Sequence, residues 1–294
     1  MDDIKQKNKG MKYPMLNAVS IDVEYWYSGE PYSNYKTDNT EDQLQEAITP
    51  LLQILKENQI LGTFFVLGIV AEQHPALVKH LVESGHEVAS HGYTHKRVHQ
   101  MNPKEFEQDI KKSISVLSSI TGEQPIGYRA PSFSIDASTP WALQILKKNG
   151  FVYDSSVFPI QTHLYGEPAA PLEPYTPSME DITTIDQSNE FIEFPLSVYT
   201  LLNTSIPVSG GMYFRRTPHV FLRHAITKIN KTRPFIFYVH PWETYRHTPK
   251  VALPFQKKFF AYYGMKNALK KFERLMKEFT FTTIQHVLQE QGLL

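Results

Sequence analysis

The chain has 294 residues, of which 41% are hydrophobic and 20% charged, a composition typical of globular proteins with one large or two small domains. Lys and Arg together number 30, as do Asp and Glu, so no basic excess indicates binding to nucleic acid or to an anionic membrane. The lack of cysteine excludes disulfides and thiolate metal ligands. Any metal site must therefore use His and carboxylate side chains.

Residues 1–12 are polar and rich in Lys, and we expect a flexible N-terminal tail there, followed by one domain over 13–294. The longest apolar stretch, 61–71, is far shorter than the roughly 20 residues that a membrane-spanning helix needs. The N-terminal residues also lack the apolar core of a signal peptide. These features predict a cytoplasmic protein without a membrane span.

Short runs of β-forming residues alternate with amphipathic stretches along the chain. Strands are predicted at 16–22, 63–67, 87–90, 125–129, 151–154, 191–197, 235–240 and 279–282. Helices are predicted at 41–58, 76–84, 103–119, 140–148, 218–230 and 255–277. This alternation predicts an α/β fold, a distorted, TIM-barrel-like (β/α) barrel of seven to eight strands in a single domain. The active site of such a barrel lies at the C-terminal ends of the strands.

Two segments stand out from this alternation. The segment 158–190 is rich in Pro, and because a loop of this length inside a domain is usually functional, we expect it to cover the barrel mouth like a lid. The run from Ser209 to Arg215 places Gly210 and Gly211 ahead of a predicted helix. Such a pair permits either close approach of the backbone to a ligand or a tight turn, and the sequence favours neither interpretation.

Titratable side chains gather at the ends of the predicted strands. His91 and His95 follow the strand 87–90 four residues apart, a spacing that places both rings on one side of a helical turn, where they can bind one metal ion. Because the chain has 12 His, a pair at this spacing is weak evidence by itself. It is strengthened by polar residues that close other predicted strands, namely Asp22, Glu24, Arg129, Asp154 and His240.

Asp22 and Glu24 occupy alternate positions at the end of the first strand. Side chains at i and i+2 of a strand point the same way, so both carboxylates are expected to face one cavity. One carboxylate would complete a three-ligand metal site, and the other would take a proton from water. The alternative is that Asp22 caps a turn and Glu24 is solvated. Tyr25 and Trp26 follow, either as a surface for a sugar ring or as packing.

Five dispersed segments resemble, in order, the motifs of the polysaccharide deacetylase family, also known as carbohydrate esterase family 4. They are Ser-Ile-Asp-Val-Glu at 20–24, Ser-His-Gly-Tyr-Thr-His at 90–95, Tyr-Arg-Ala-Pro-Ser-Phe at 128–133, Tyr-Asp-Ser-Ser at 153–156 and His-Pro-Trp-Glu at 240–243. The later part, with Gly210 to Phe214, is similar to the branch associated with bacterial exopolysaccharide gene clusters. The resemblance implies a distorted (β/α) barrel that removes acetyl groups from sugars with a divalent metal ion.

The resemblance also implies roles for individual residues. Asp22 would be the catalytic base, His91 and His95 metal ligands, and His240 the general acid. Arg129 would orient Asp22, and Asp154 would support Arg129 or His240. The chain departs from the family pattern at Val23, where a second Asp is usual. We therefore expect Glu24 to be the third metal ligand.

Substrate contacts are expected from Ser132, Phe133, Trp242, Tyr25 and Trp26. The backbone N–H of Ser132 would bind the developing oxyanion. Ser132 stands where the family pattern has an aromatic residue, which shifts the aromatic contact to Phe133.

Zinc is the first expectation for two imidazoles and a carboxylate, and iron, cobalt or nickel suit the same ligands. The predicted partner is an acetylated sugar or oligosaccharide, with an N-acetyl group as the first expectation and an O-acetyl group as the alternative that the sequence leaves open. One alternative is a hydrolase of non-sugar amides or cyclic imides on the same fold. Another is a catalytically silent carbohydrate-binding barrel.

Overall fold

The computed structural model describes residues 15–29, 32–36, 42–162, 165–202 and 204–294. The tail predicted over residues 1–12 lies outside the described residues. Within the described ranges, no helix combines the length and the apolar composition needed to cross a membrane.

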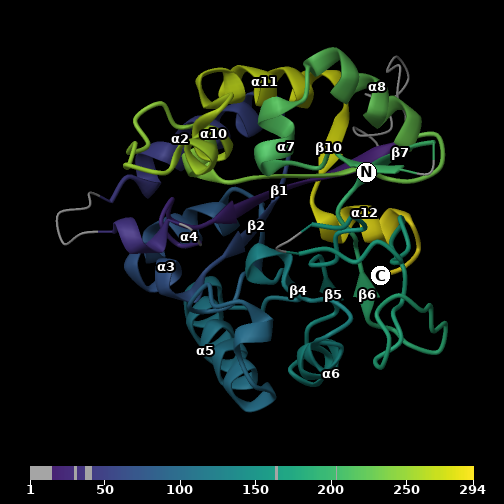
Figure 1. The fold of residues 1–294 in the computed structure, drawn as a ribbon. Helices are drawn as coiled ribbons and strands as arrows, with labels where there is room; N and C mark the ends of the chain where they lie inside the picture. Colours follow the sequence, from purple (N-terminus) through teal and green to yellow (C-terminus); the bar gives the residue numbers. More distant parts are fainter. Residues whose placement is uncertain (1–14, 30–31, 37–41, 163–164, 203) are drawn as a thin grey trace.

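A curled parallel sheet forms the centre of the molecule (Figure 1). Its strands are β1 (Leu16–Val23), β2 (Thr63–Val66), β3 (Glu87–Ser90), β4 (Gly127–Tyr128), β5 (Tyr153–Asp154), β6 (Ile192–Glu193), β9 (Ile236–Val239) and β10 (Thr280–Thr282). The order is β9-β1-β2-β3-β4-β5-β6, and β10 pairs with the first half of β1. Every predicted strand is present, and the distorted (β/α) barrel in a single domain is confirmed.

Hydrogen bonds of Ser197 and Ser209 connect the chain after β6 to β9, where β6 and β9 do not pair directly. The N–H of Ile236 donates to Ser197 Oγ at 2.9 Å, and Ser209 Oγ donates to the Ser197 carbonyl. The N–H of Tyr238 donates to the carbonyl of Ser209 at 2.9 Å. The segment around residue 209 therefore takes the place of a further strand and closes the curled sheet.

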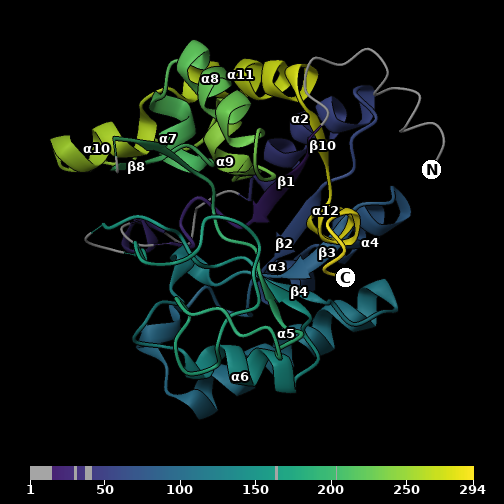
Figure 2. The ribbon, with the colours of Figure 1, turned by 90° about the vertical axis from the view of Figure 1, so that its right-hand side faces the viewer.

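Helices cover both outer sides of this sheet (Figure 2). They are α2 (Leu44–Glu57), α3 (Gly68–Gln73), α4 (Pro75–Glu83), α5 (Pro103–Thr121), α6 (Trp141–Lys148), α7 (Gly211–Arg216), α8 (His219–Ile229), α9 (Pro241–Thr244), α10 (Phe255–Tyr262), α11 (Met265–Glu278) and α12 (Ile284–Glu290). Short 3-10 helices occur at η2 (Ser33–Tyr35), η3 (Val98–Gln100) and η4 (Pro131–Phe133). In both views α2, α8 and α11 lie on one side and α5 and α6 on the other.

The single helix predicted over 255–277 is wrong, because the chain forms two helices, α10 and α11. Gly264 lies between them with a φ of +81°, a conformation that ends a right-handed helix. A Cβ at this position would lie 2.6 Å from the carbonyl oxygen of Arg215, so the tight packing also requires glycine. The two helices also differ in packing, because α11 buries Ala268, Phe272, Leu275 and Met276, whereas Phe255, Phe259 and Phe260 of α10 are exposed.

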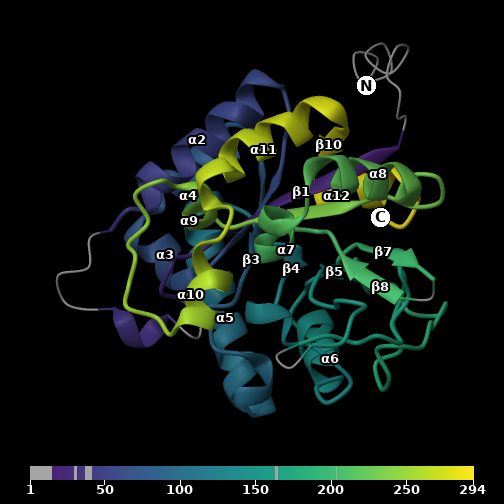
Figure 3. The same ribbon diagram turned by 45° about the horizontal axis from the view of Figure 1, so that its top comes forward.

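The predicted elements did not include helices α3, α7, α9 and α12 or strands β7 and β8. Strands β7 (Val198–Leu201) and β8 (Thr204–Pro207) form an antiparallel hairpin beside α8, outside the parallel sheet (Figure 3). The hairpin is held to α8 by Tyr199, whose ring meets that of Phe221 at a centroid distance of 5.8 Å. The predicted strand 191–197 shortens to β6, since the chain turns into this hairpin directly afterwards.

The amino end of the barrel is filled by α12. Its side chains Ile284, Val287 and Leu288 belong to the apolar cluster inside the barrel, together with Ala18 and Ile236. Burial of each large aliphatic side chain contributes about 1.5–3 kcal/mol to folding, so the plug stabilises this end. The carboxyl ends of the strands are thereby left for polar side chains.

The described part of the segment 158–190 is an ordered loop. Phe158 and Tyr165 stack in parallel at 5.9 Å, and Ile182 is buried in the cluster that also contains residues of α6. A bridge joins Tyr175 to Glu193 at the edge of the sheet. These contacts anchor the segment to α6 and β6, and its role as a lid stays a prediction.

Candidate active site

Asp22 and Glu24 lie at the carboxyl end of β1 and are almost fully buried. His240 Nε2 lies 3.8 Å from Asp22 Oδ2 and 3.6 Å from Glu24 Oε1. The two carboxylates therefore face the same imidazole, as expected for alternate positions of a strand. Val23, between them, is buried in the outer apolar cluster.

The turn that carries His91 and His95 is not helical, and the prediction of a helical turn is wrong. Gly92 has a φ of +76° and His95 a φ of +59°, so the chain after β3 reverses through left-handed conformations. The carboxylate of Asp109, on α5, accepts the N–H of Tyr93 at 2.7 Å and the N–H of Thr94 at 3.2 Å. This anchored turn brings the two imidazole rings to a centroid distance of 5.4 Å.

Glu24, His91 and His95 form a group suited to a metal ion. Each offers one ligand atom, and the three atoms lie within 4.8 Å of one another. His91 Nδ1 lies 2.8 Å from the carbonyl oxygen of Arg129, which can only accept, so the proton is on Nδ1 and the Nε2 lone pair faces Glu24. A metal-ligating His usually makes this kind of backbone contact with its other nitrogen.

Two further observations fit a cation at this position. Glu24 Oε2 is buried without a hydrogen-bond donor of suitable geometry, although His95 Nε2 lies only 2.5 Å away. Burial lowers the pKa of His91 to about 4, so its imidazole stays neutral, as a metal ligand must be. Burial opposes ionisation of Glu24, but the imidazoles of His95 and His240 outweigh it and lower the pKa to about 2. The donor set, one carboxylate and two imidazoles, is that of catalytic zinc sites.

Arg129 is fully buried and holds Asp22. Its Nη1 donates to Asp22 Oδ1 at 2.7 Å and to Ser20 Oγ at 2.8 Å. Its Nε and Nη2 donate to the carbonyl and hydroxyl oxygens of Ser155, each at 3.0 Å. The guanidinium also lies over the ring of Phe65 at 4.1 Å. One oxygen of Asp22 is thus fixed, and the other faces His240.

Asp154 does not hold either of the two residues that it was predicted to support. It accepts a hydrogen bond from Ser156 Oγ at 2.6 Å and pairs across the sheet with Glu193. Burial raises the pKa of Asp154 to about 6 and raises that of Glu193, so the two carboxyl groups retain protons to higher pH than usual. Arg129 acts on Asp154 through space, because the hydrogen bonds of the guanidinium go to Asp22 and to serines.

His240 follows β9 and begins the short helix α9. Its Nδ1 lies 2.8 Å from Glu243 Oε2, and Glu243 Oε1 accepts from Arg215 Nε at 2.8 Å. Burial disfavours the imidazolium, but Glu24 and Glu243 raise the pKa of His240 to about 9. Sequence reasoning assigned no role to Glu243 or Arg215. The available signal was Pro241 at the first helical position with Glu243 at the third, a capping pattern after His240.

The residues predicted to contact substrate fall into two groups. Trp242 stacks on His240 at 5.5 Å, and its Nε1 lies 3.4 Å from Glu24 Oε1. Phe133 is buried against Tyr238 at a centroid distance of 4.9 Å, and Ser132 before it has a φ of +56°. Such left-handed conformations outside glycine are strained and are often found at functional sites.

Tyr25 and Trp26 lie on the other side of Glu24. The hydroxyl of Tyr25 donates to Gln73 Oε1 at 2.6 Å, and its ring stacks on Tyr27, which favours the packing interpretation. Trp26 is buried and lines a cavity of about 10 Å³ with Glu24 and Trp242. That volume holds about one water molecule.

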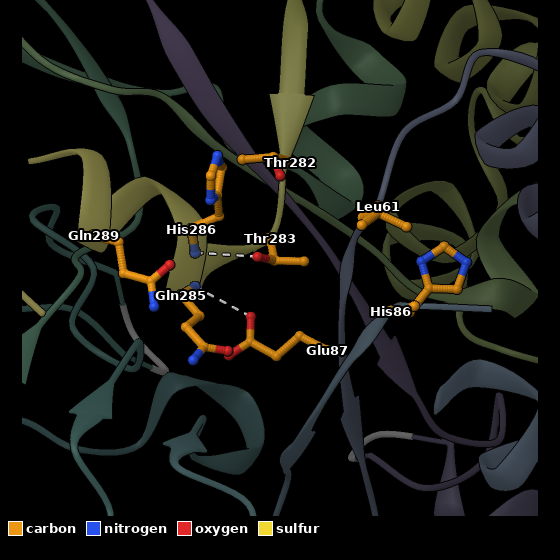
Figure 4. A pocket seen from close by; sticks show the side chains of 9 residues that line it. Leu61, His86, Glu87, Thr282, Thr283, Gln285, His286 and Gln289 are labelled. Carbon is orange, nitrogen blue, oxygen red and sulfur yellow. Dashed lines mark hydrogen bonds between the residues drawn. The ribbon is translucent and has the colours of Figure 1, made fainter. Parts of the chain in front are cut away.

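A larger cavity, of about 350 Å³, lies at the amino end of the barrel (Figure 4). Figure 4 shows Leu61 and His86 on one side of it and Gln285, His286 and Gln289 of α12 on the other. Glu87 is the acidic residue of its lining, and its carboxylate already accepts from Thr63, Tyr153 and the N–H of Gln285. This cavity lacks a group of free ligand atoms, so its size does not mark it as the reaction site.

Comparison with known proteins gives the family. Residues 38–153 match the family model for polysaccharide deacetylases, and residues 155–289 match a domain of unknown function, DUF3473. Residues 38–153 therefore form a polysaccharide deacetylase domain. The predicted resemblance to this family is confirmed, whereas the exopolysaccharide branch within it stays a prediction.

Curated relatives match part of this chain. A peptidoglycan deacetylase of Helicobacter pylori is 34% identical over 110 residues, which are 37% of this chain and 36% of the relative. A peptidoglycan-N-acetylglucosamine deacetylase of Bacillus cereus is 32% identical over 123 residues, 41% of this chain and 44% of the relative. The peptidoglycan deacetylase-like protein FGM2 of Gibberella zeae is 37% identical over 103 residues, 35% of this chain and 30% of the relative. The matches thus span less than half the length of these relatives.

Solved structures share the fold over nearly the whole chain. A Mycobacterium smegmatis protein classed with the polysaccharide deacetylases has a TM-score of 0.62 at 20% identity, covering 97% of this chain and 93% of that one. Puue allantoinase has a TM-score of 0.56 at 16% identity, covering 97% and 92%. At these identities the likeness concerns the fold alone.

Proposed function

We propose that this protein is a metal-dependent deacetylase that removes N-acetyl groups from a sugar or polysaccharide precursor, releasing acetate. One observation carries the proposal. A base held by Arg129, an imidazole facing it at 3.8 Å and a Glu24, His91 and His95 ligand group lie together at the carboxyl end of the barrel. Deacetylase relatives that match a third or more of the chain support the same chemistry.

Asp22 is the proposed general base. Arg129 holds Oδ1, so Oδ2 is the atom that accepts a proton from water as the water oxygen bonds to the acetyl carbon. His240 is the proposed general acid, and its Nε2 gives a proton to the sugar nitrogen as the C–N bond breaks. The products are acetate and a free amine. Protonation of the departing nitrogen is what an amide requires, so the imidazole favours N-acetyl over O-acetyl substrates.

Glu24, His91 and His95 are the residues proposed to hold the metal, with zinc as the first ion to test. When bound, such an ion supplies a Lewis acid that polarises the acetyl carbonyl and lowers the pKa of water. Trp242, stacked on His240, would exclude bulk water from one side of the acetyl group. Phe133 and the backbone of Ser132 are proposed to line the same space.

The test measures acetate released from N-acetylated chitooligosaccharides and from peptidoglycan by the zinc-loaded protein. We expect release by the wild-type protein and a loss of about 1,000-fold in Asp22→Asn, because a general base typically contributes 100-fold to 10,000-fold. Unchanged turnover in Asp22→Asn would exclude the proposed mechanism. Turnover of cyclic imides without acetate release from sugars would favour the amide hydrolase instead. Binding of oligosaccharide without any turnover would favour the silent barrel.

A further inference from the structure

Glu243 fixes the imidazole ring of His240 in one orientation. The ring atom Nδ1 lies 2.8 Å from Glu243 Oε2, and a carboxylate can only accept, so Nδ1 carries a proton. This leaves Nε2 facing Asp22 and Glu24, at 3.8 and 3.6 Å. Rotation of the ring about the Cβ–Cγ bond of His240 would move Nε2 away from that position. The contact with Glu243 prevents this rotation.

Glu243 is in turn fixed by Arg215. Glu243 Oε1 accepts from Arg215 Nε at 2.8 Å, and each side chain is 2% exposed. Glu243 Oε2 also lies 3.3 Å from the backbone N–H of His240, as in a helix cap. A buried carboxylate is costly unless its charge is compensated, and here a guanidinium and an imidazole compensate it from opposite sides.

Arg215 is tied to the end of α10. Its Nη1 donates to the carbonyl oxygens of Ala261 and Tyr263 at 2.9 and 2.8 Å, and its Nη2 to that of Phe260 at 3.1 Å. These are carbonyl groups that a helix C-terminus leaves without intrahelical partners. The guanidinium therefore has a rigid frame, which a flexible surface arginine lacks.

The glycine pair at the start of α7 explains how Arg215 reaches this place. A Cβ at Gly210 would lie 1.9 Å from the carbonyl oxygen of Tyr238, and one at Gly211 would lie 2.6 Å from its hydroxyl, at a φ of +54°. Tyr238 lies in β9, two residues before His240. The pair thus permits close packing of α7 on β9, and this observation favours packing over approach to a ligand.

We infer that Arg215 and Glu243 are positioning residues for His240, and that the run from Ser209 to Arg215 exists to support proton delivery to the leaving nitrogen. The inference rests on the proposed deacetylase function. It assigns to Glu243 the supporting role that the sequence had given to Asp154. Neither residue touches the reacting atoms, so each acts through the imidazole.

The test is the variant Glu243→Gln, assayed on two substrates. Gln has one acceptor oxygen in its side chain, so it can satisfy Arg215 or His240 but not both. On an N-acetylated chitooligosaccharide, whose amine must be protonated to leave, we expect kcat to fall about 100-fold with little change in KM. On 4-nitrophenyl acetate, whose phenolate leaves without a proton, the fall should be less than about threefold, because the acid is not needed.

The matched control is Glu278→Gln. Glu278 Oε2 and His219 Nε2 also lie 2.8 Å apart, in a Glu–His pair of α11 and α8 away from the site. This variant should leave both rates unchanged. If Glu243→Gln lowered the rates on both substrates equally, Glu243 would have a structural role only. If it lowered neither rate, Glu243 would have no role in the reaction. Both results would overturn the inference.

A readout that needs no turnover keeps the inference separate from the proposed function. In ¹⁵N-histidine NMR spectra the Nδ1–H signal of His240, assigned through His240→Asn, should be present in the wild-type protein and in Glu278→Gln. It should be lost in Glu243→Ala, which has no side-chain acceptor. If the wild-type protein hydrolyses neither substrate, the proposed function fails. The positioning of His240 by Glu243 is refuted separately if the Nδ1–H signal survives in Glu243→Ala.

Arg215→Lys is a second variant in case Glu243→Gln does not fold. Lys keeps the positive charge but has a single nitrogen in place of the planar fork. We therefore expect kcat on the N-acetylated oligosaccharide to fall about tenfold in Arg215→Lys, with a smaller change on 4-nitrophenyl acetate. Equal effects on the amide and the ester would also contradict the inference.

Discussion

The two ends of the barrel each contain a glutamate and nearby histidines, but the groups are used differently. At the amino end, Glu87 accepts three hydrogen bonds from the protein beside the larger cavity. At the carboxyl end, Glu24 Oε2 has no hydrogen-bond donor of suitable geometry, and imidazole nitrogens of His91 and His95 face it. Burying a polar atom without a partner is costly, so it indicates a partner that binds later. The convergence of one carboxylate and two imidazoles, and not cavity size, marks the proposed site.

Removal of one histidine from each end tests this comparison most strongly. His91→Ala removes one of three proposed ligands, and we expect metal affinity to fall by more than the roughly 100-fold that loss of an outer contact causes. His86→Ala, beside the amino-end cavity, should bind metal like the wild-type protein. Metal content after dialysis and calorimetric titration with zinc measure both. Equal metal binding in all three proteins would show that the carboxyl-end group is not a metal site.

Removal of one carboxylate from each end should separate activity from stability. Glu87→Ala leaves the hydroxyls of Thr63 and Tyr153 and the N–H of Gln285 without their acceptor. We expect the free energy of unfolding to fall by about 3 kcal/mol, at about 1–3 kcal/mol for each buried group that finds no water. Below its unfolding temperature, Glu87→Ala should still release acetate, whereas Asp22→Asn should lose this activity. Urea unfolding and acetate release measure the two effects.

The reverse outcome for this pair would break the comparison. If Glu87→Ala abolished deacetylation in a folded protein, the amino-end cavity would take part in the reaction. If Asp22→Asn unfolded the chain while Glu87→Ala left the unfolding transition unchanged, Asp22 would be a structural partner of Arg129. The free energies of unfolding of both variants distinguish these cases from the expected one.

The sequence predicted the local elements better than the contacts between them. Strand β3 has the predicted bounds, because alternation and turn residues act locally. The break at Gly264 was missed, since it depends on the carbonyl of Arg215, which is distant in sequence. The helical turn at His91 to His95 was wrong because Asp109 of α5 holds the turn in another conformation.

The support of His240 shows the same limit at the site. Spacing identified Asp22, His91 and His240 at strand ends, where the fold brings them together. Spacing did not reveal that Arg215 holds Glu243, because that contact requires the close approach of α7 to β9. Asp154 was assigned by resemblance, and its neighbour Glu193 on β6 determines its actual environment.

The pair of Asp154 and Glu193 gives the smallest expected effect and tests a further buried carboxyl site, which lies outside the proposed metal group. In the unfolded chain both groups ionise near pH 4, whereas burial raises the pKa of Asp154 to about 6 in the folded protein and raises that of Glu193 as well. Between these values the folded state binds more protons than the unfolded state, so its stability falls as the pH rises. The contribution is fully present below pH 4 and is lost as the pH passes through about 6.

Glu193→Gln should remove most of this dependence. The amide can donate to Asp154, which stabilises the ionised carboxylate and lowers its pKa. In the wild-type protein this pair should lower the free energy of unfolding as the pH rises from 5 to 8. In the variant the decrease should be about 2 kcal/mol smaller, at about 1.4 kcal/mol for each pKa unit. Urea titrations of both proteins at the two pH values measure it, and groups elsewhere cancel in the comparison. Parallel pH profiles would mean that the two carboxyl groups already share their charge with Arg129 and bury no proton.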